Sequence, residues 1–181
     1  MELRRKLFHL FALLLWIVPI VYFPKSITLA LFVLVMAINL LVVLRVGFKR
    51  LGWFYRFVLS LERPKNYQRP GIQALWANLG IFISYLISKE GAVAGVLVLA
   101  VGDAISGLAG QRWGKKKLLG KSLEGFLAFF LSSFICLLPF YGLWQTLVLA
   151  FVGAVTELLS GRIDDNFTVP ICVSLTYTLF Y

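Results

Sequence analysis

Residues 102–125 read GDAISGLAGQRWGKKKLLGKSLEG and join two apolar runs through a loop rich in glycine and lysine. Asp103 lies near the end of the first run and Glu124 at the start of the second. The cations between them are Arg112, Lys115, Lys116, Lys117 and Lys121. Glycine has no side chain, so backbone N–H groups can approach a polyphosphate closely, and the nearby cations can neutralise its charge. Mg²⁺ often binds one or two protein carboxylates together with phosphate oxygens. The stretch therefore predicts a nucleotide site at which Asp103 and Glu124 bind a metal ion.

A simpler interpretation of the same stretch is a basic cytoplasmic loop of a membrane protein, with each carboxylate paired to a nearby lysine. The two interpretations predict different outcomes for Asp103→Asn. At a cation site, removing the charge leaves thermal stability unchanged or raises it, because a neutral side chain is less costly in an apolar helix. In a lysine pair, the same change leaves a buried cation without its partner and lowers stability.

The composition is that of a membrane protein. The chain of 181 residues is 60% hydrophobic with a mean hydropathy of +0.88, well above that of a soluble domain. We expect an all-α, polytopic membrane protein with a single domain over residues 1–181. It would have seven transmembrane helices, or six if the short apolar tail does not cross. The expected spans cover residues 7–23, 27–44, 72–88, 91–110, 122–143, 145–160 and 167–181.

Residues 45–71 differ from the spans. Apolar side chains recur there at helical spacing, at Leu51, Phe54, Tyr55, Val58 and Leu61, with cations on the rest of the turn. This pattern predicts an amphipathic helix in the membrane surface. The span over residues 91–110 is rich in glycine and alanine, which lets helices approach closely, so we expect it at the centre of the bundle.

The charges orient this topology. Sixteen of the 18 Lys and Arg residues fall on the side of the N-terminus, leaving only Lys25 and Lys89 on the other. The positive-inside rule then places the N-terminus and the 102–125 loop in the cytoplasm, at a cell inner membrane or an ER-type membrane. The same rule accounts for the net charge of +10 without nucleic acid, so no nucleic-acid partner is expected. Homo-oligomerisation is left open.

Several acidic residues gather on this cytoplasmic side. Asp103, Glu124 and Glu157 lie within or at the ends of apolar runs, and an ionised carboxylate costs about 2.5–3.5 kcal/mol at mid-helix. Such residues usually face a polar cavity or a cation. Asp165 and Asn166 follow in the last cytoplasmic loop, where Asp and Asn are also ordinary turn residues. Beside the lysine loop, the group favours a nucleotide–metal site.

The chain resembles the CTP-dependent lipid-alcohol kinases, which include dolichol kinase, phytol kinase and CTP-dependent diacylglycerol kinase. It is more distantly similar to phosphatidate cytidylyltransferases. The residues that match the family's cytoplasmic signature are Asp103, Gly110, Gly114, Lys121, Ser122, Glu124 and Gly125. Ser106 and Gly120 depart from that signature, Ser122 replaces a threonine, and the loop is shorter than in dolichol kinases. Two further motifs match: Arg5, Lys6 and His9 near the N-terminus, and Glu157, Asp165, Asn166 and Pro170 near the C-terminus.

The resemblance implies transfer of the γ-phosphate of CTP, with Mg²⁺, to the hydroxyl of a membrane lipid such as a polyprenol, dolichol, phytol, geranylgeraniol or diacylglycerol. The implied catalytic residues are Asp103, Glu124, Glu157 and Asp165. The implied metal ligands are Asp103, Glu124 and Asp165, and either Glu157 or Asp165 would accept the alcohol proton. The implied nucleotide-binding residues are Gly110, Gly114, Lys115, Lys116, Lys117, Lys121, Ser122, Gly125, Arg5, Lys6, His9 and Asn166.

Two other functions remain open from the sequence. A cytidylyltransferase would use the same nucleotide and metal, but a lipid phosphate would attack the α-phosphate. A small cation-coupled transporter would place its ionisable residues near the bilayer midplane, often within inverted repeats. Here these residues cluster on one side and no repeat is evident, which favours an enzyme.

The expected topology predicts that residues 111–121 face the cytoplasm. In a variant whose Cys136 and Cys172 are replaced by alanine, a cysteine introduced by Lys116→Cys should react with a membrane-impermeant thiol reagent only from the cytoplasmic side. Lys25→Cys in the same background should react only from the opposite side. Labelling at position 116 from outside would overturn the orientation.

Overall fold

The computed structural model describes residues 2–47, 49–161 and 163–180, and of residue 65 the backbone alone. Arg162 and Tyr181, which the expected topology places in the last cytoplasmic loop and the last span, lie outside the described residues. The helices are α1 (Glu2–Leu14), α2 (Ile17–Tyr22), α3 (Lys25–Val43), α4 (Gly52–Leu61), η1 (Pro64–Asn66), α5 (Ile72–Ile87), α6 (Lys89–Trp113), α7 (Leu123–Leu137), α8 (Leu143–Leu159) and α9 (Asp165–Thr178). A short antiparallel hairpin, β1 (Lys117–Leu118) and β2 (Lys121–Ser122), joins α6 to α7.

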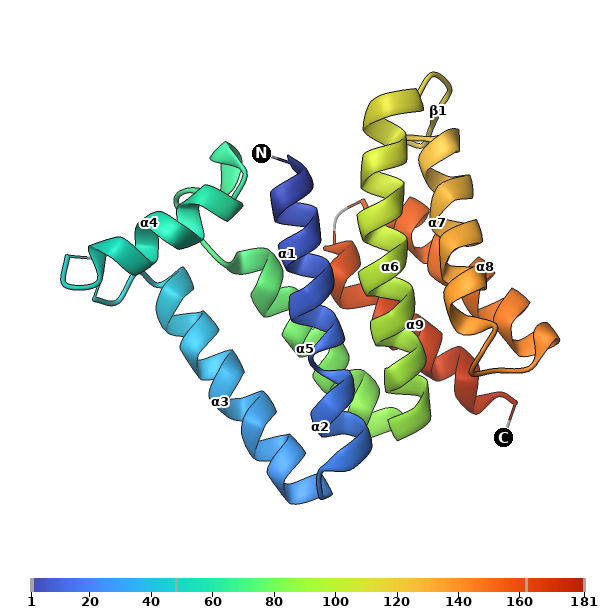
Figure 1. The fold of residues 1–181 in the computed structure, drawn as a ribbon, viewed down its shortest axis with the longest axis horizontal. Helices are drawn as coiled ribbons and strands as arrows, with labels where there is room; N and C mark the ends of the chain where they lie inside the picture. The colour runs from blue at the N-terminus through green and yellow to red at the C-terminus, as the bar shows by residue number, and fades with distance from the viewer. Residues whose placement is uncertain (1, 48, 162, 181) are drawn as a thin grey trace.

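The predicted all-α architecture is confirmed, and the glycine-rich helix α6 lies between α1 and α7 with α9 packed against it (Figure 1). Small residues allow this close packing. A Cβ at Gly95 would lie 2.9 Å from the carbonyl oxygen of Pro170 in α9, and one at Gly102 would meet the ring of Phe129 in α7 at 2.6 Å. The position of α6 follows from its lack of side-chain bulk.

Three helical segments have the length and composition needed to cross a membrane: Glu2–Tyr22, Lys25–Val43 and Lys89–Trp113. Three shorter helices, α5, α7 and α8, are also apolar. Together with the many exposed apolar side chains, they make this an integral membrane protein. The total of seven spans stays a prediction.

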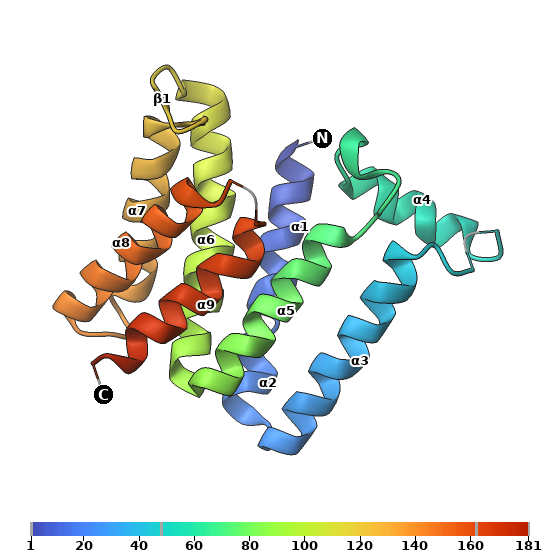
Figure 2. The ribbon, with the colours of Figure 1, turned by 180° about the vertical axis from the view of Figure 1, so that it is seen from behind.

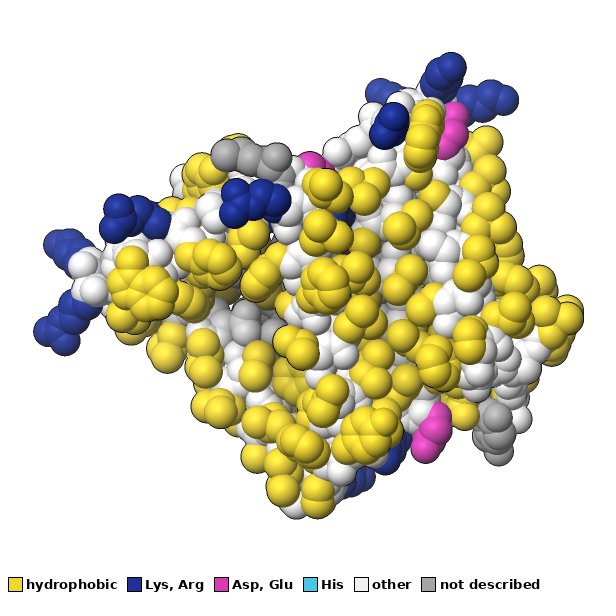
Figure 3. All heavy atoms as spheres, viewed as in Figure 1, with side chains coloured by type: hydrophobic (Ala, Val, Ile, Leu, Met, Phe, Trp, Pro, Cys, Tyr) yellow, Lys and Arg dark blue, Asp and Glu magenta, His cyan; other side chains and the backbone are white. Residues whose placement is uncertain are grey.

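The helices alternate in direction between two ends of the bundle. The N-terminus, α4, the β hairpin and the start of α9 lie at one end, and the α2–α3, α5–α6 and α7–α8 turns lie at the other (Figures 1 and 2). Lys and Arg side chains gather over α4 and the hairpin on the face seen in Figure 3. This arrangement agrees with the predicted topology, and its orientation in a membrane stays a prediction.

The first expected span, residues 7–23, is two helices in the structure. Leu15 and Trp16 form a turn between α1 and α2, because Pro19 has no N–H to donate to the carbonyl of Leu15. Helix α1 also begins earlier than expected, at Glu2, so that Arg5 and Lys6 lie on a helix.

The predicted amphipathic helix within residues 45–71 is confirmed as α4. Tyr55, on its apolar face, is 2% exposed and donates a hydrogen bond to the carbonyl of Val46 at 2.7 Å. Near the opposite end of the bundle, Phe32 of α3 stacks on Trp16 with ring centroids 3.9 Å apart. Between these contacts α3 and α4 stand away from α1, and the surface is hollowed there (Figure 3).

Candidate active site

A cavity of about 760 Å³ opens at the end of the bundle that carries α4 and the hairpin. Its polar wall comes from α1, α6, the hairpin and the facing ends of α8 and α9. Its apolar wall comes mainly from α3 and α4, through Ile38, Val42, Phe54, Phe57, Val58 and Leu61. One continuous space therefore joins charged groups to an apolar surface.

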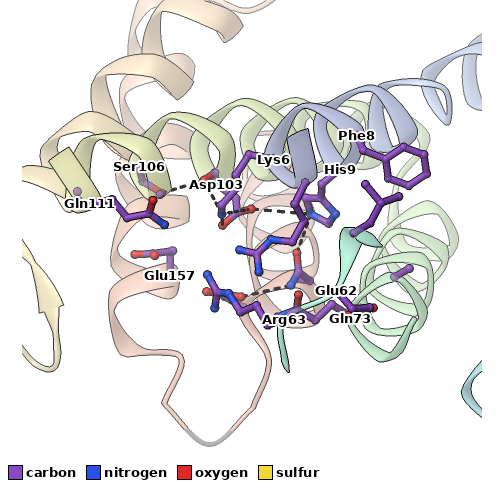
Figure 4. Close-up of a pocket in the computed structure, with 18 of the residues that line it drawn as sticks. Lys6, Phe8, His9, Glu62, Arg63, Gln73, Asp103, Ser106, Gln111 and Glu157 are labelled. Carbon is purple, nitrogen blue, oxygen red and sulfur yellow. Dashed lines mark hydrogen bonds and ion pairs between the residues drawn. The ribbon is translucent and has the colours of Figure 1, made fainter. Parts of the chain in front are cut away.

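Lys6 and Asp103 form the central ion pair of the polar wall. The Lys6 ammonium donates to both carboxylate oxygens of Asp103, at 2.7 and 2.8 Å, and to its backbone carbonyl at 3.0 Å. Gly107 leaves room for this arrangement, because a Cβ there would lie 2.5 Å from the Cε of Lys6 and the lysine would have to shift. Figure 4 shows Lys6 and His9 reaching from α1 toward Asp103 on α6. The pair ties α1 to the central helix.

Lys121 forms a second centre, with Glu157 and Asp165. Its ammonium donates to the Glu157 carboxylate and carbonyl, each at 2.6 Å, and to Asp165 at 2.9 Å. Partial burial acts to lower the pKa of Lys121, but the facing Asp165 and Glu157 outweigh it and raise that pKa above its usual value. Lys121 is therefore a fixed positive charge at neutral pH, held between α8 and α9.

His9 lies between the two centres and contacts Asn166, whose amide nitrogen is 3.5 Å from Asp165 Oδ1. Its Nε2 lies 2.9 Å from Asn166 Oδ1 and 3.9 Å from Asp103 Oδ2. The amide nitrogen of Asn166 donates to Asp164 Oδ1 at 2.6 Å, which leaves Asn166 Oδ1 to accept from His9. Asp164 also caps α9 through the Asn166 N–H, and burial raises the pKa of its carboxyl. Parts of the N-terminal and C-terminal motifs thus meet at one place.

Three lysines where α6 leads into the hairpin have no ion-pair partners among the described residues. Lys115 and Lys116, just before β1, and Lys117 in β1 are exposed at the mouth of the cavity, and none forms an ion pair with another described residue. We call these three the hairpin lysines. Lys6 and Lys121 each already donate three hydrogen bonds. A phosphate entering this conformation would therefore meet the hairpin lysines first.

The predicted glycines lie beside the cavity, but their N–H groups are engaged. Gly114 donates to the carbonyl of Gly110 at 3.1 Å, and Gly125 donates to Ser122 Oγ at 3.1 Å. A Cβ at Gly110 would approach Ser122 Oγ to 2.9 Å. In this conformation the glycines let α6 and α7 cross closely, and their use in binding phosphate stays a prediction.

Glu124 differs from the other predicted acidic residues, because its side chain does not line the cavity with Asp103. Its Oε1 lies 3.4 Å from the Lys116 N–H, and its buried Oε2 has no hydrogen-bond partner among the described residues. The described residues also contain no group of three or more His, Cys, Asp or Glu side chains that could hold a metal ion. Asp103 and Asp165 do line the cavity, where Lys6 and Lys121 hold them. Their chemistry fits Mg²⁺, which usually takes only one or two protein carboxylates, and its binding here stays a prediction.

Sequence reasoning missed two of the residues that shape the site. Gly107 was not singled out, although it lies one helical turn after Asp103 and thus on the same face of α6. Arg63 enters the sequence argument only as one of the sixteen cations on the cytoplasmic side, yet it lines the cavity beside Glu62. Nothing in the local sequence marks Arg63, because its place depends on how the chain turns after α4.

The chain is similar over part of its length to three known proteins. It is 38% identical over 120 residues to an uncharacterized protein of Methanocaldococcus jannaschii, covering 63% of this chain and 62% of that protein. It is 33% identical over 93 residues to the phytol kinase of Synechocystis sp., covering 44% of this chain and 40% of the kinase. It is 32% identical over 95 residues to the dolichol kinase of Schizosaccharomyces pombe, covering 47% of this chain and 19% of the kinase.

The chain thus spans less than two thirds of the length of each of these relatives. No family model and no solved structure matches it. The likeness to two kinases, one named for phytol and one for dolichol, supports a relation to lipid-alcohol kinases, as the sequence motifs predict.

The Lys6–Asp103 pair predicts a stability loss for either single substitution. The side chains are 8% and 20% exposed, so Asp103→Asn leaves a nearly buried ammonium without its counter-charge, at a cost of roughly 3 kcal/mol. This replaces the sequence-based expectation of unchanged or higher stability. The double variant Lys6→Met/Asp103→Asn should recover much of the loss. Thermal unfolding in detergent measures all three, and a fully stable Asp103→Asn protein would contradict the pairing.

Proposed function

We propose that this chain is a kinase that transfers the γ-phosphate of CTP to the hydroxyl of a membrane lipid alcohol. The observation that carries the proposal is the single cavity in which a lysine-rich polar wall continues into the apolar wall of α3 and α4. A lipid alcohol needs both surfaces, because its hydroxyl must reach the phosphates while its chain stays in an apolar environment. The likeness to a phytol kinase and a dolichol kinase supports the same class of substrate.

The polar wall would bind and position the nucleotide. Phosphoryl transfer depends mainly on alignment and charge neutralisation. The exposed lysines of the hairpin would contact the triphosphate, and Lys121 would hold Glu157 and Asp165 in place behind it. In the reaction the alcohol oxygen forms a bond to the γ-phosphorus, and the bond from that phosphorus to the β,γ-bridging oxygen breaks. The hydroxyl proton passes to Glu157 or Asp165, and CDP leaves.

Asp103, Asp165 and Glu124 are the proposed residues for Mg²⁺, and the ion would supply further charge neutralisation to the phosphates. Of these, Asp103 and Asp165 line the cavity. Glu124 would contribute only after its carboxylate turned from the hairpin, and its unpartnered Oε2 leaves it an oxygen with which to do so.

The apolar wall would hold the lipid chain. Phe54, Val58 and Leu61 recur on one face of α4, and Ile38 and Val42 of α3 stand beside them along the cavity. The hollow between α3–α4 and α1 gives a path from the bilayer into this space without passing through water (Figure 3).

The proposal of CTP as the phosphate donor rests on the resemblance of the motifs to the CTP-dependent kinases. The test therefore compares CTP with ATP.

The test is transfer of label to lipid by the purified protein in neutral-lipid nanodiscs. Label from γ-³²P-CTP should enter a prenyl alcohol such as geranylgeraniol or phytol, and γ-³²P-ATP should serve less well. Replacing Lys115, Lys116 and Lys117 together by glutamine should lower kcat/KM for the nucleotide by about 100-fold, because three phosphate contacts are lost. These side chains are exposed and unpaired among the described residues, so the fold should persist.

The matched control is the double variant Lys49→Gln/Arg50→Gln, which removes exposed cations at the same end of the bundle but away from the cavity. It should keep near-normal turnover. Incorporation of label from α-³²P-CTP into a lipid phosphate would instead identify a cytidylyltransferase. Failure of every alcohol and donor to react would refute the kinase assignment.

A further inference from the structure

A second cationic group lies on the α1–α4 side of the cavity, away from the hairpin lysines. Arg5 of α1 and Arg63, just after α4, both donate to one oxygen of Glu2, with Arg63 Nη2 at 3.2 Å. Both arginines line the cavity (Figure 4 labels Arg63). They approach from segments far apart in the sequence, and the proposed transfer step uses neither.

One donor of this group is left without a partner. Arg5 Nη1 is buried and makes no hydrogen bond to any described residue. The Arg5 side chain as a whole is 13% exposed. A buried guanidinium donor without an acceptor is costly, and such a group often marks a position where a ligand binds. Because Arg5 lines the cavity, an anion there could accept from Nη1.

The nearby acidic residues leave room for an anion. Glu62 accepts from the Gly71 N–H at 2.7 Å and from Asn66 Nδ2 at 3.2 Å, so both its oxygens are engaged. Glu2 balances only one of the two guanidinium charges. Asp103 is held by Lys6. Glu62 keeps its negative charge, so Glu2 and Glu62 together balance the two guanidinium groups, but the oxygens of Glu62 bond to neither arginine. Arg63, with its side chain 40% exposed, can turn toward a ligand.

The position of this group selects the kind of anion. Arg5 lies one turn before Phe8 on α1, and Phe8 meets Phe57 of α4 with ring centroids 5.9 Å apart. Arg63 follows Leu61, another residue of the apolar wall. An anion held here would have its attached chain beside the apolar wall. Guanidinium groups also match the geometry of phosphate oxygens better than an ammonium does.

We infer that Arg5 and Arg63 form a subsite for the phosphomonoester of a membrane lipid, with its chain along α3 and α4. The inference rests on the proposed function for the identity of that lipid, which would be the product of the transfer. The hairpin lysines would bind the nucleotide, and Arg5 and Arg63 would receive the phosphate once it is attached to the lipid. A free nucleotide phosphate has the same chemistry, so the test includes both sources.

The experiment measures equilibrium binding of geranylgeranyl monophosphate to the protein in phosphatidylcholine nanodiscs, with no nucleotide present. Arg63→Gln should weaken this binding at least about tenfold, because a charge-assisted hydrogen bond is lost. Arg63→Lys should restore only part of the affinity, since it keeps the charge and loses the planar fork. Arg56→Gln is the matched control, because Arg56 is an exposed cation of α4 that does not line the cavity, and it should bind normally.

A second arm measures CTP binding, which should change less than about twofold in Arg63→Gln. Loss of CTP affinity with intact lipid-phosphate affinity would overturn the inference and assign the pair to the nucleotide. Equal losses in Arg63→Gln and Arg56→Gln would show general attraction to a basic surface and would also overturn it, as would no binding by the wild type. Because no turnover is measured, Arg63-dependent binding by a protein that transfers no phosphate would uphold the subsite and refute only the kinase assignment.

Discussion

The site depends on the ion pair between Lys6 and Asp103. The Lys6 side chain packs against Gly107 and its ammonium donates to both carboxylate oxygens of Asp103. It places a full ion pair among apolar helices, where an unpaired charge of either sign would be costly. It also fixes α1 against α6, which brings His9 to Asn166 and Arg5 to the edge of the cavity. Gly107 leaves the space in which the end of the lysine side chain lies, and a larger residue there would force the lysine to shift.

The cavity owes its shape to how unevenly the helices pack. Helix α6 is surrounded by α1, α5, α7 and α9, whereas α3 packs mainly against α5 and α4 makes only a light contact with α1. Tight packing around α6 holds the charged groups in fixed positions. Looser packing of α3 and α4 against α1 leaves an apolar space, which in the expected topology opens toward the bilayer. The proposed reaction uses both properties, because the phosphates need fixed partners and the lipid needs a way in.

Much of this could be predicted from the sequence, because it depends on local patterns. Apolar runs predict helices, small residues predict the central place of α6, and the spacing from Leu51 to Leu61 predicts α4. Four residues of the motifs, Asp103, Glu157, Asp165 and Asn166, line one cavity, and their roles in a site stay predictions. Contacts that depend on tertiary geometry could not be predicted. Lys6 pairs with Asp103, 97 positions away in the sequence. Glu124 faces the hairpin, and Arg63 lines the cavity. The loop glycines suggested free N–H groups, yet the chain itself accepts from those of Gly114 and Gly125.

The central claim is that one cavity receives a lipid alcohol along α3 and α4 with its hydroxyl toward the lysine wall. Photolabelling tests it most directly, using a prenyl alcohol that carries a diazirine near the far end of its chain. Irradiation in nanodiscs should place the label on residues of the apolar wall, such as Ile38, Phe54 and Val58, and excess unlabelled alcohol should suppress it. Label spread over outward-facing residues of α7 and α8, such as Ile135 and Phe151, and unaffected by competitor would contradict the account.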